Sequence, residues 1–326
     1  MDIYMQLIQK IKSAPRKGIV FPEGENLNIV KAAVRLKEEG LMRPILLGNL
    51  QKIRKLLGGL EGDGIAVLDP ESDSKLEEFA KIYHEKRGIP ETICKRMMSQ
   101  PLFFGAMMVR EGLSHGMLAG ISCPTAEVIA VSELVIGLKK GCSRISSFYI
   151  MDIPGFHGTQ ESLLIFADPA VNPNPSPEEL ADIAVTTAES ARDLLGWTPR
   201  VALLSFSTKG STEHPDIEKV TNSLKIIHEK APGLQADGEL QADAALLPKV
   251  AKKKTDGESS VAGRANILIF PDLDAANISS KLVQILGKAS SFGPILQGFS
   301  RPVSDLSRSA TAQDIYSTAL FVAAGK

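Results

Sequence analysis

Short apolar runs alternate with amphipathic helical patterns along almost the whole chain, and this alternation is the feature that most constrains the fold. The run GIVFPEG (residues 18–24) is typical of a buried strand that ends in a turn, NIVKAAVRLKEEG (28–40) of a helix, and PILLG (44–48) of the next strand. Strands joined through helices lie parallel, because the helix carries the chain back to the end of the sheet where the first strand began. The pattern predicts an α/β fold with mainly parallel sheets flanked by helices.

The same pattern continues through the rest of the sequence. Further strands are predicted in the stretches 64–70, 116–122, 200–208, 265–274 and 293–298, and further helices over 1–18, 74–88, 176–196 and 214–233. The helix at Ser176 opens with Ser-Pro-Glu-Glu, which supplies a capping hydroxyl, a proline in the first turn and carboxylates at the positive end of the helix dipole.

A chain of 326 residues exceeds the usual length of a single domain, so we expect two. The predicted first domain comprises residues 1–145 together with 309–326, and the second comprises residues 146–308. The proline-rich stretch ADPAVNPNPSPEE (167–179) is either a linker or a rigid surface loop. The stretch KKKTDGESSVAG (252–263) is polar enough to be a mobile loop.

Charge and composition argue against several classes of function. The formal net charge is −1 at pH 7, which gives no global attraction to nucleic acid or to an anionic membrane surface. No apolar stretch reaches the roughly 18 residues that a membrane span needs, and the N-terminal stretch is charged throughout, unlike a signal peptide. The three cysteines, Cys94, Cys123 and Cys142, are odd in number and lack metal-binding spacing. We therefore expect a cytoplasmic protein with reduced thiols, small-molecule substrates, and no metal, nucleic-acid or membrane site.

In open α/β sheets, ligands bind beyond the carboxyl ends of the strands, so the polar residues that follow each predicted strand are candidate binding residues. The loop STKGSTEHP (207–215) offers hydroxyl and backbone N–H groups that can hold an oxyanion. The candidates are Ser207, Thr208, Gly210 and Ser211 in this loop, Ser122 and Thr125 after the strand at 116–122, and Asn277 after the strand at 265–274. All three stretches also have the composition of ordinary turns or helix caps, as do Asp272 and Asp274.

The stretch SRPVSDLSRSATAQD (300–314) concentrates charge and hydroxyl groups near the end of the chain. We expect a helix from about Thr311, with Asp305 and Ser307 as candidate caps. Arg308 would lie at the positive end of its dipole and need an anionic partner from solvent, a carboxylate or a ligand. With Asp314 in the same cleft, the pair could stabilise developing negative charge and accept a proton. The alternative is a simple cap and a pair too far apart to interact.

Seven stretches, in the same order along the chain, resemble the phosphate acetyltransferase (phosphotransacetylase) family. They are VFPEGENLNIVKAA, PLFFGAMMVREG, VNPNPSPEELADIAVTTAESA, PRVALLSFSTKGS, DGELQADAAL, IFPDLDAANI and GPILQGFSRPVSDLSRSATAQDI. Among the branches of this family, RVALLSFSTKGSTEHP and VIGLKKGCSRISS resemble the ethanolamine-utilisation version most. The resemblance covers nearly the whole chain.

The resemblance implies reversible acetyl transfer between coenzyme A and inorganic phosphate, with coenzyme A or acetyl-CoA as substrate and no tightly bound cofactor. It also implies a homodimer, an architecture like that of isocitrate and isopropylmalate dehydrogenases, and an active site in a cleft between two domains. The catalytic aspartate of the family falls on Asp314, and its Ser-Arg pair falls on Ser307 and Arg308. In the implied mechanism the aspartate deprotonates the thiol of coenzyme A, the thiolate attacks acetyl phosphate, and the serine and arginine stabilise the resulting charge.

The chain departs from the family pattern where three arginines are expected. Those positions hold Asn28, Ala130 and Ile285, and Ser280 stands where the family commonly has tyrosine. Neither alanine nor isoleucine can replace the bidentate donor of an arginine.

The departures leave several interpretations open. The chain is an acetyltransferase with weakened binding, compensated by Arg301, Arg144, Arg87 or Lys209, or it is a diverged homologue with a regulatory, structural or ligand-binding role. An acyltransferase for a longer acyl group is another alternative. A metal-dependent dehydrogenase that uses Asp272, Asp274 and Asp305 is the remaining one.

Overall fold

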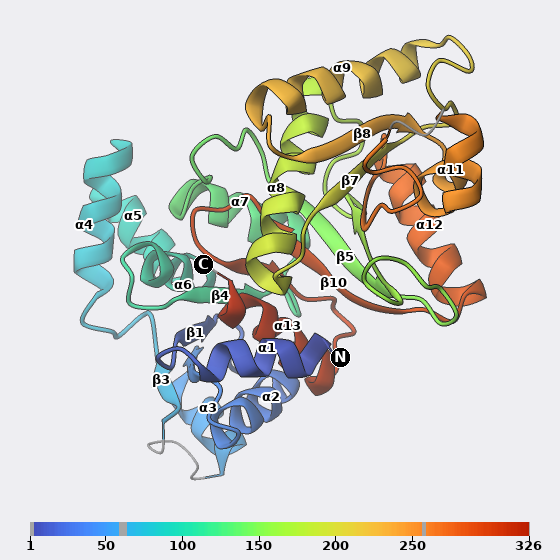
Figure 1. Cartoon of the computed structure of the whole chain (residues 1–326). Helices are drawn as coiled ribbons and strands as arrows, with labels where there is room; N and C mark the ends of the chain where they lie inside the picture. Colours follow the sequence, from blue (N-terminus) through green and yellow to red (C-terminus); the bar gives the residue numbers. More distant parts are fainter. Residues whose placement is uncertain (1–2, 59–63, 256–258, 326) are drawn as a thin grey trace. The chain divides into compact units, whose positions relative to one another are not determined.

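A computed structural model describes residues 3–58, 64–255 and 259–325, which form two compact units (Figure 1). Unit 1 is Met1–Lys140 with Phe299–Lys326, and unit 2 is Gly141–Gly298. Each unit is built on its own β-sheet, and most of the strand pairs are parallel. The predicted α/β class, with mainly parallel sheets flanked by helices, is confirmed.

Unit 1 contains a five-stranded sheet in the order β11-β4-β1-β2-β3. The strands are β1 (Gly18–Phe21), β2 (Arg43–Leu47), β3 (Ala66–Leu68), β4 (Gly116–Ala119) and β11 (Val303–Asp305). The helices are α1 (Ile3–Lys12), α2 (Leu27–Glu38), α3 (Leu50–Leu57), α4 (Leu76–Arg87), α5 (Glu91–Met98), α6 (Pro101–Arg110), α7 (Thr125–Val135) and α13 (Ala312–Ala324). Its neighbouring strands pair in parallel, so their carboxyl ends lie at one edge.

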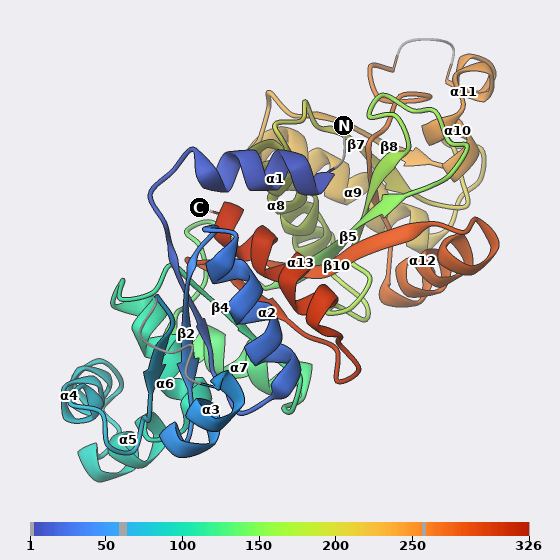
Figure 2. The ribbon, with the colours of Figure 1, turned by 90° about the horizontal axis from the view of Figure 1, so that it is seen from below.

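Helices cover both faces of the unit 1 sheet, with α1, α2 and α13 on one side and α6 and α7 on the other (Figure 2). The inward face of α2 follows from helical spacing, since Ile29, Ala33 and Leu36 are fully buried at intervals of three and four residues. The N-cap of α2 is Asn26, whose side chain accepts hydrogen bonds from the first-turn backbone N–H groups of Asn28 and Ile29.

Unit 2 contains a six-stranded sheet in the order β10-β5-β6-β9-β7-β8. The strands are β5 (Ser146–Asp152), β6 (Leu163–Ala167), β7 (Arg200–Leu204), β8 (Gln235–Leu240), β9 (Ile267–Ile269) and β10 (Ser290–Gln297). The helices are α8 (Pro177–Leu195), α9 (Pro215–Lys230), α10 (Ala242–Leu246), α11 (Pro248–Lys254) and α12 (Leu273–Leu286). The pairs β6·β9, β9·β7 and β7·β8 are parallel, whereas β10·β5 and β5·β6 are antiparallel.

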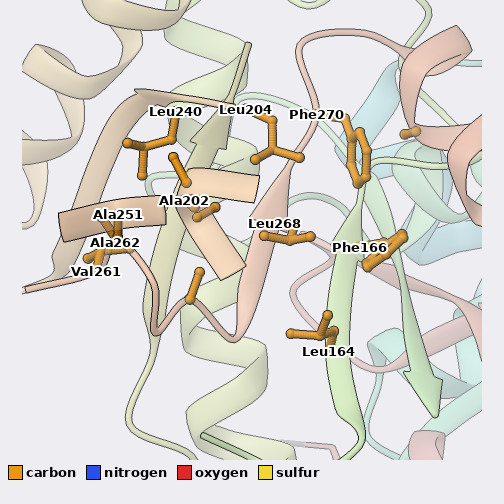
Figure 3. Packing of buried hydrophobic residues seen from close by; sticks show 14 of the residues in the cluster. Leu164, Phe166, Ala202, Leu204, Leu240, Ala251, Val261, Ala262, Leu268 and Phe270 are labelled. Carbon is orange, nitrogen blue, oxygen red and sulfur yellow. The ribbon is translucent and has the colours of Figure 1, made fainter. Parts of the chain in front are cut away.

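The core of unit 2 forms because alternate residues of neighbouring strands point to the same face of the sheet (Figure 3). Ala202 and Leu204 of β7 lie beside Leu268 of β9 in this cluster. The rings of Phe166 and Phe270 approach to 5.2 Å between centroids at an angle of 53°, a tilted geometry that aromatic pairs favour.

The predicted opening of the helix at Ser176 is confirmed as a capping box. Ser176 Oγ accepts from the backbone N–H of Glu179 at 3.3 Å, and the Glu179 carboxylate accepts from the backbone N–H of Ser176 at 2.8 Å. The proline-rich stretch that precedes α8 lies inside unit 2, between β6 and α8, so it is a loop of one unit and no linker between two.

The units differ from the expected domains at their boundaries. Residues 141–145, expected in the first domain, belong to unit 2, and residues 299–308, expected in the second domain, belong to unit 1, where β11 pairs in parallel with β4. In the polar stretch 252–263, residues 252–254 end α11, and residues 256–258 lie outside the described residues. Within the described ranges, the helices are all too short or too polar to cross a membrane.

Candidate active site

Three loops of unit 1 leave the sheet next to one another at its carboxyl edge. They follow β1, β4 and β11, which are neighbours in the sheet. The loops carry Glu23, residues 120–125 and residues 306–311, respectively. This edge is where α/β sheets bind ligands, and it gathers the predicted residues Ser122, Thr125, Ser307 and Arg308 on neighbouring loops.

The Glu23 carboxylate is held by four consecutive backbone N–H groups of the loop after β4. Its Oε2 accepts from Gly120 and Ile121 at 2.8 and 3.0 Å, and its Oε1 accepts from Ser122 and Cys123 at 2.5 and 3.1 Å. Successive N–H groups of this kind form a nest for an oxyanion. Glu23 therefore occupies the nest from within the chain, and the Ser122 residue remains exposed beside it.

Asp305 ends β11 and is buried, with 7% of its surface exposed. Its Oδ2 accepts a hydrogen bond of 2.5 Å from Oγ1 of Thr125, the first residue of α7, while its Oδ1 has no hydrogen-bond partner among the residues that the structure describes. Burial raises the pKa of Asp305 to about 6; the hydrogen bond from Thr125 lowers it, and the charge of Glu23 adds to the increase. The expectation that Asp305 caps the following helix is wrong, because β11 includes Asp305 and its side chain bonds to α7.

The packing around Asp305 requires glycine at position 120. Gly120 has a φ of +119°, and a Cβ atom there would lie 2.2 Å from Asp305 Oδ1. Close by, burial and then the charge of Glu23 raise the pKa of the Cys123 thiol to about 12. A thiol with such a pKa stays protonated at neutral pH, so Cys123 is not an activated nucleophile.

Ser307 and Arg308 lie in an exposed turn between β11 and α13. The Ser307 and Ser309 hydroxyl oxygens are 3.0 Å apart, and Ser307 Oγ accepts from the backbone N–H of Ser309 at 3.3 Å. Among the described residues, the Arg308 guanidinium has no hydrogen-bond or ion-pair partner. Its donors are therefore free for an anion from solution.

Asp314 occupies the third position of α13 and takes part in a capping box with the N-cap, Thr311. Its Oδ2 accepts from the backbone N–H of Thr311 at 2.9 Å and from the Thr311 hydroxyl at 2.7 Å. The cap therefore falls on Thr311 and Asp314, while Ser307 stabilises the preceding turn. The box leaves Oδ1 of the exposed Asp314 without a hydrogen bond from the rest of the described chain.

Asn28, at one of the positions where an arginine was expected, contacts the segment that carries Arg308. Its Nδ2 donates to the Ala310 carbonyl at 3.1 Å and so joins the first turn of α2 to this segment. Ala130 is exposed on α7, and Ile285 is 74% exposed on α12. Neither of these two side chains can donate a hydrogen bond.

Three of the four cations considered as replacements for the missing arginines are bound within the protein. Arg144 is 3.1 Å from the Glu179 carboxylate, Lys209 pairs with Asp237, and Arg87 donates to the Leu134 carbonyl. Arg301 has no hydrogen-bond or ion-pair partner within the parts of the chain that the structure describes. Of these four cations, Arg301 is the one without such a partner in the described ranges.

The predicted phosphate loop of unit 2 follows β7 and is organised around the buried carboxylate of Glu239. Glu239 Oε1 accepts from Ser207 Oγ at 2.9 Å and from the backbone N–H of Gly210 at 2.7 Å. The Ser211 hydroxyl lies 3.1 Å from Ser207 Oγ and accepts from the backbone N–H of Thr208 at 3.2 Å. Glu239 thus binds the Ser207 hydroxyl and the Gly210 backbone N–H, two of the groups that the sequence predicts as phosphate donors. The residues Gly210 and Ser211 are exposed.

Asn277 and Asp272 have local partners in unit 2. The Asn277 side-chain amide donates to the Pro169 carbonyl at 3.0 Å, and Asp272 is the N-cap of α12, where it accepts from the backbone N–H of Ala275 at 2.8 Å. A cavity of about 620 Å³ opens beside Asp272. Its lining includes Leu204, Phe206, Phe270, Asp272 and Asp274, and its volume suits a small organic ligand.

The carboxylates of Glu23, Asp305 and Glu239 organise these loops, a role that the sequence pattern did not predict for any of them. One feature of the sequence could have indicated Glu23 and Glu239: each is an acidic residue in or just after a strand and close to a loop of small residues. In the described ranges, no three His, Cys, Asp or Glu side chains are grouped so that they could hold a metal ion.

Comparison with known proteins identifies the family. The chain matches the phosphate acetyl/butaryl transferase family over residues 3–323. The phosphate acetyltransferase of Thermoanaerobacterium thermosaccharolyticum is 43% identical over 318 residues, which cover 97% of this chain and 96% of that protein. The chain belongs to the phosphate acetyl/butaryl transferase family, a family of acyltransferase enzymes, and the sequence-based identification is confirmed.

Solved structures agree with this assignment. A phosphotransacetylase from Streptococcus pyogenes has a TM-score of 0.92 and 39% identity, and covers 99% of this chain and 97% of its own. The EutD phosphotransacetylase from Staphylococcus aureus has a TM-score of 0.91 and 35% identity, and covers 99% and 98%. These nearly equal scores favour neither branch. A 4-hydroxythreonine-4-phosphate dehydrogenase from Klebsiella pneumoniae, 12% identical with a TM-score of 0.53 over 96% of this chain and 100% of its own, shares the fold alone.

Proposed function

We propose that this protein is a phosphate acetyltransferase, which transfers an acetyl group reversibly between coenzyme A and inorganic phosphate. Membership of the family supports the reaction class. The observation that carries the residue assignment is the segment 307–314, where a partner-free arginine and a carboxylate with one free oxygen follow the same strand. This is the pairing of anion binding and proton acceptance that the reaction requires.

The proposed general base is Asp314. Its Oδ2 is fixed by Thr311, so its Oδ1 is the oxygen available to accept the proton of the coenzyme A thiol. An unperturbed thiol has a pKa near 8.5 and is only a few per cent ionised at neutral pH, so a positioned base raises the supply of thiolate. The capping box restricts the rotation of this carboxylate and thereby places its free oxygen.

The thiolate then attacks the carbonyl carbon of acetyl phosphate, and a carbon–sulfur bond forms. The carbon–oxygen bond to phosphate breaks in the same overall step, and inorganic phosphate departs with the bonding electron pair. Arg308 presents two parallel N–H donors that match phosphate oxygens, and Ser307 adds a hydroxyl donor. The reverse reaction uses the same groups with the proton returned from Asp314 to the thiolate.

In unit 2 we propose substrate contacts for the exposed part of the loop after β7. Ser211 and Gly210 remain at the surface, whereas Ser207 and Thr208 are buried and shape the loop. Asn277 contributes by holding the Pro169 backbone, and in unit 1 the exposed Ser122 is the corresponding hydroxyl beside the loop of Glu23. The absence of arginine at Ala130 and Ile285 leads us to expect a high KM for coenzyme A.

The experiment that tests this function measures release of the coenzyme A thiol from acetyl-CoA. Thiol release should depend on inorganic phosphate and disappear when sulfate replaces phosphate at equal ionic strength. Release that is equally fast without phosphate would identify a thioester hydrolase and contradict the proposal. Acetyl-, propionyl- and butyryl-CoA compared in the same assay would establish the acyl preference.

We also propose that the protein acts as a homodimer in the cytoplasm, because its substrates coenzyme A and acetyl phosphate are found there. One face of α12 supports self-association, because Ile278, Leu282, Ile285 and Leu286 recur at helical spacing and are each more than half exposed. Full burial of such a side chain contributes about 1.5–3 kcal/mol, and a symmetric interface buries each one twice. Taken over the four side chains of both protomers, this free energy is of the size needed to offset the cost of association, about 4–15 kcal/mol.

The variant Ile285→Glu is expected to convert the dimer into a monomer, because a symmetric interface would bring two unpaired carboxylates together. Sedimentation equilibrium gives the mass of each species, and Ile93→Glu, at a half-exposed isoleucine of α5, is the matched control. A wild-type monomer, or a dimer that survives Ile285→Glu, contradicts the proposed role of this face.

A further inference from the structure

A continuous set of contacts runs behind the turn that carries Ser307 and Arg308. Glu23 fixes the backbone of residues 120–123, and this backbone leads directly into Thr125 at the start of α7. Thr125 donates to Asp305, which lies two residues before Ser307. The chemical steps proposed above leave Asp305 without a role.

We propose that Asp305 is a positioning residue for acetyl transfer, which fixes the Ser307–Arg308 turn against the N-terminus of α7 through the hydrogen bond from Thr125. The inference rests on the proposed function, because it concerns the arginine that would receive phosphate. It adds a residue that acts through Arg308 and touches no substrate.

The turn is anchored at its two ends and exposed between them. At its start, the backbone N–H of Leu306 donates to the Ala119 carbonyl at 2.8 Å, next to the carboxyl group of Asp305. At its end, Asn28 donates to the Ala310 carbonyl. Because Arg308 has no partner of its own among the described residues, these anchors set where the backbone that carries its side chain lies. A misplacement of about 1 Å in such a group can cost roughly 10²-fold in rate.

The environment of Asp305 is poor for a residue with a merely structural role. Its Oδ1 is buried without a hydrogen bond from the described part of the chain, and a buried polar atom left unpaired is destabilising. Within the described ranges, the titratable groups that act on it are Glu23 after β1 and Cys123 after β4, and neither is a cation. A structural link alone would be served at lower cost by an uncharged residue, so we assign the carboxyl group a functional role.

The two protonation states of Asp305 hold Thr125 with different strength. An ionised carboxylate is a stronger acceptor than a neutral carboxyl group, so the link is tightest after the proton is lost. Burial places the pKa of Asp305 at about 6, so the link weakens as the pH falls through that value. Turnover should therefore decline below about pH 6.

The test compares kcat between pH 5 and pH 8 for the wild type, Asp305→Asn and Thr125→Val. Asp305→Asn should lose the decline near pH 6 and have a kcat lowered by about 10- to 100-fold, with the KM for coenzyme A changed less than twofold. Thr125→Val should likewise lose the decline and have a lowered kcat, because it removes the hydrogen bond through which the charge of Asp305 acts. Thr125→Ser should restore the wild-type profile, and Thr221→Val on α9 is the matched control. A decline that is unchanged in both test variants overturns the inference.

A second measurement is independent of activity. Native trypsin cleavage after Arg308 reports how firmly the turn is held, because this arginine lies in an exposed segment. The cleavage rate should rise several-fold in Asp305→Asn and Thr125→Val and stay unchanged in Thr221→Val. If the wild type fails to form acetyl-CoA, the proposed function is lost, and the cleavage rates still decide whether Asp305 positions the turn. Equal cleavage rates in all variants refute the positioning role.

Discussion

Replacing Arg308 with alanine is expected to lower kcat for acetyl-CoA formation by about 10²- to 10³-fold, the usual effect of removing one donor that stabilises transition-state charge. The side chain has no partner among the described residues and lies at the surface, so its removal breaks no contact that supports the fold. The unfolding midpoint of Arg308→Ala should accordingly match that of the wild type. Initial rates at saturating coenzyme A and acetyl phosphate give the change in kcat.

Two further variants separate charge from geometry at position 308. Arg308→Lys keeps the charge but loses the two-pronged donor, so it should recover only part of the rate. Arg264→Ala removes an exposed arginine of unit 2 and serves as the control. If Arg308→Ala turns over at the wild-type rate, the arginine has no part in the reaction.

Replacing Asp314 with asparagine is expected to lower kcat by about 10²- to 10⁴-fold, because an amide oxygen cannot take the proton of the thiol. Asparagine retains an oxygen that can accept from Thr311, so the capping box and the stability of α13 should change little. Thiol release from acetyl-CoA and circular dichroism measure the two effects separately.

A base can be distinguished from a cap by a variant of the partner residue. Thr311→Ala removes the hydroxyl of the capping box and should cost about 1 kcal/mol of stability, with a smaller loss of kcat than Asp314→Asn. If Asp314→Asn and Thr311→Ala lower kcat equally, Asp314 acts through the helix and the proton acceptor lies elsewhere.

The architecture was largely predictable where strands and helices carry distinct periodicities. The segment from β1 through α2 to β2 is one example, since apolar runs flank a helix with buried residues every three or four positions. Strand β8 was not predictable, because its sequence QADGEL includes two acidic residues that bond to neighbouring loops and lacks an apolar run. The antiparallel pairing of β5 with β10 and β6 was not predictable either, because the alternation of strands and helices predicts parallel strands only.

Candidate site residues could be proposed from the sequence, but their contacts could be predicted only in part. Arg308 and Asp314 stand out by resemblance to the family, whereas spacing alone could not separate a helix cap from a base. The structure shows that Asp314 caps α13 and still keeps an oxygen free. Glu23 and Gly120, which form a hydrogen bond, are 97 positions apart in the sequence. Their contact depends on the order of the strands in the sheet, and local sequence patterns do not specify that order.

Phosphate acetyltransferase activity is tested most simply by formation of acetyl-CoA by the purified protein from acetyl phosphate and coenzyme A. Coenzyme A should be raised into the millimolar range, because Ala130 and Ile285 predict weak binding. Thioester formation should increase with protein concentration and be nearly lost in Asp314→Asn. Folded wild-type protein that forms no thioester at any concentration of coenzyme A would contradict the proposed function and identify a member of the family that has lost this reaction.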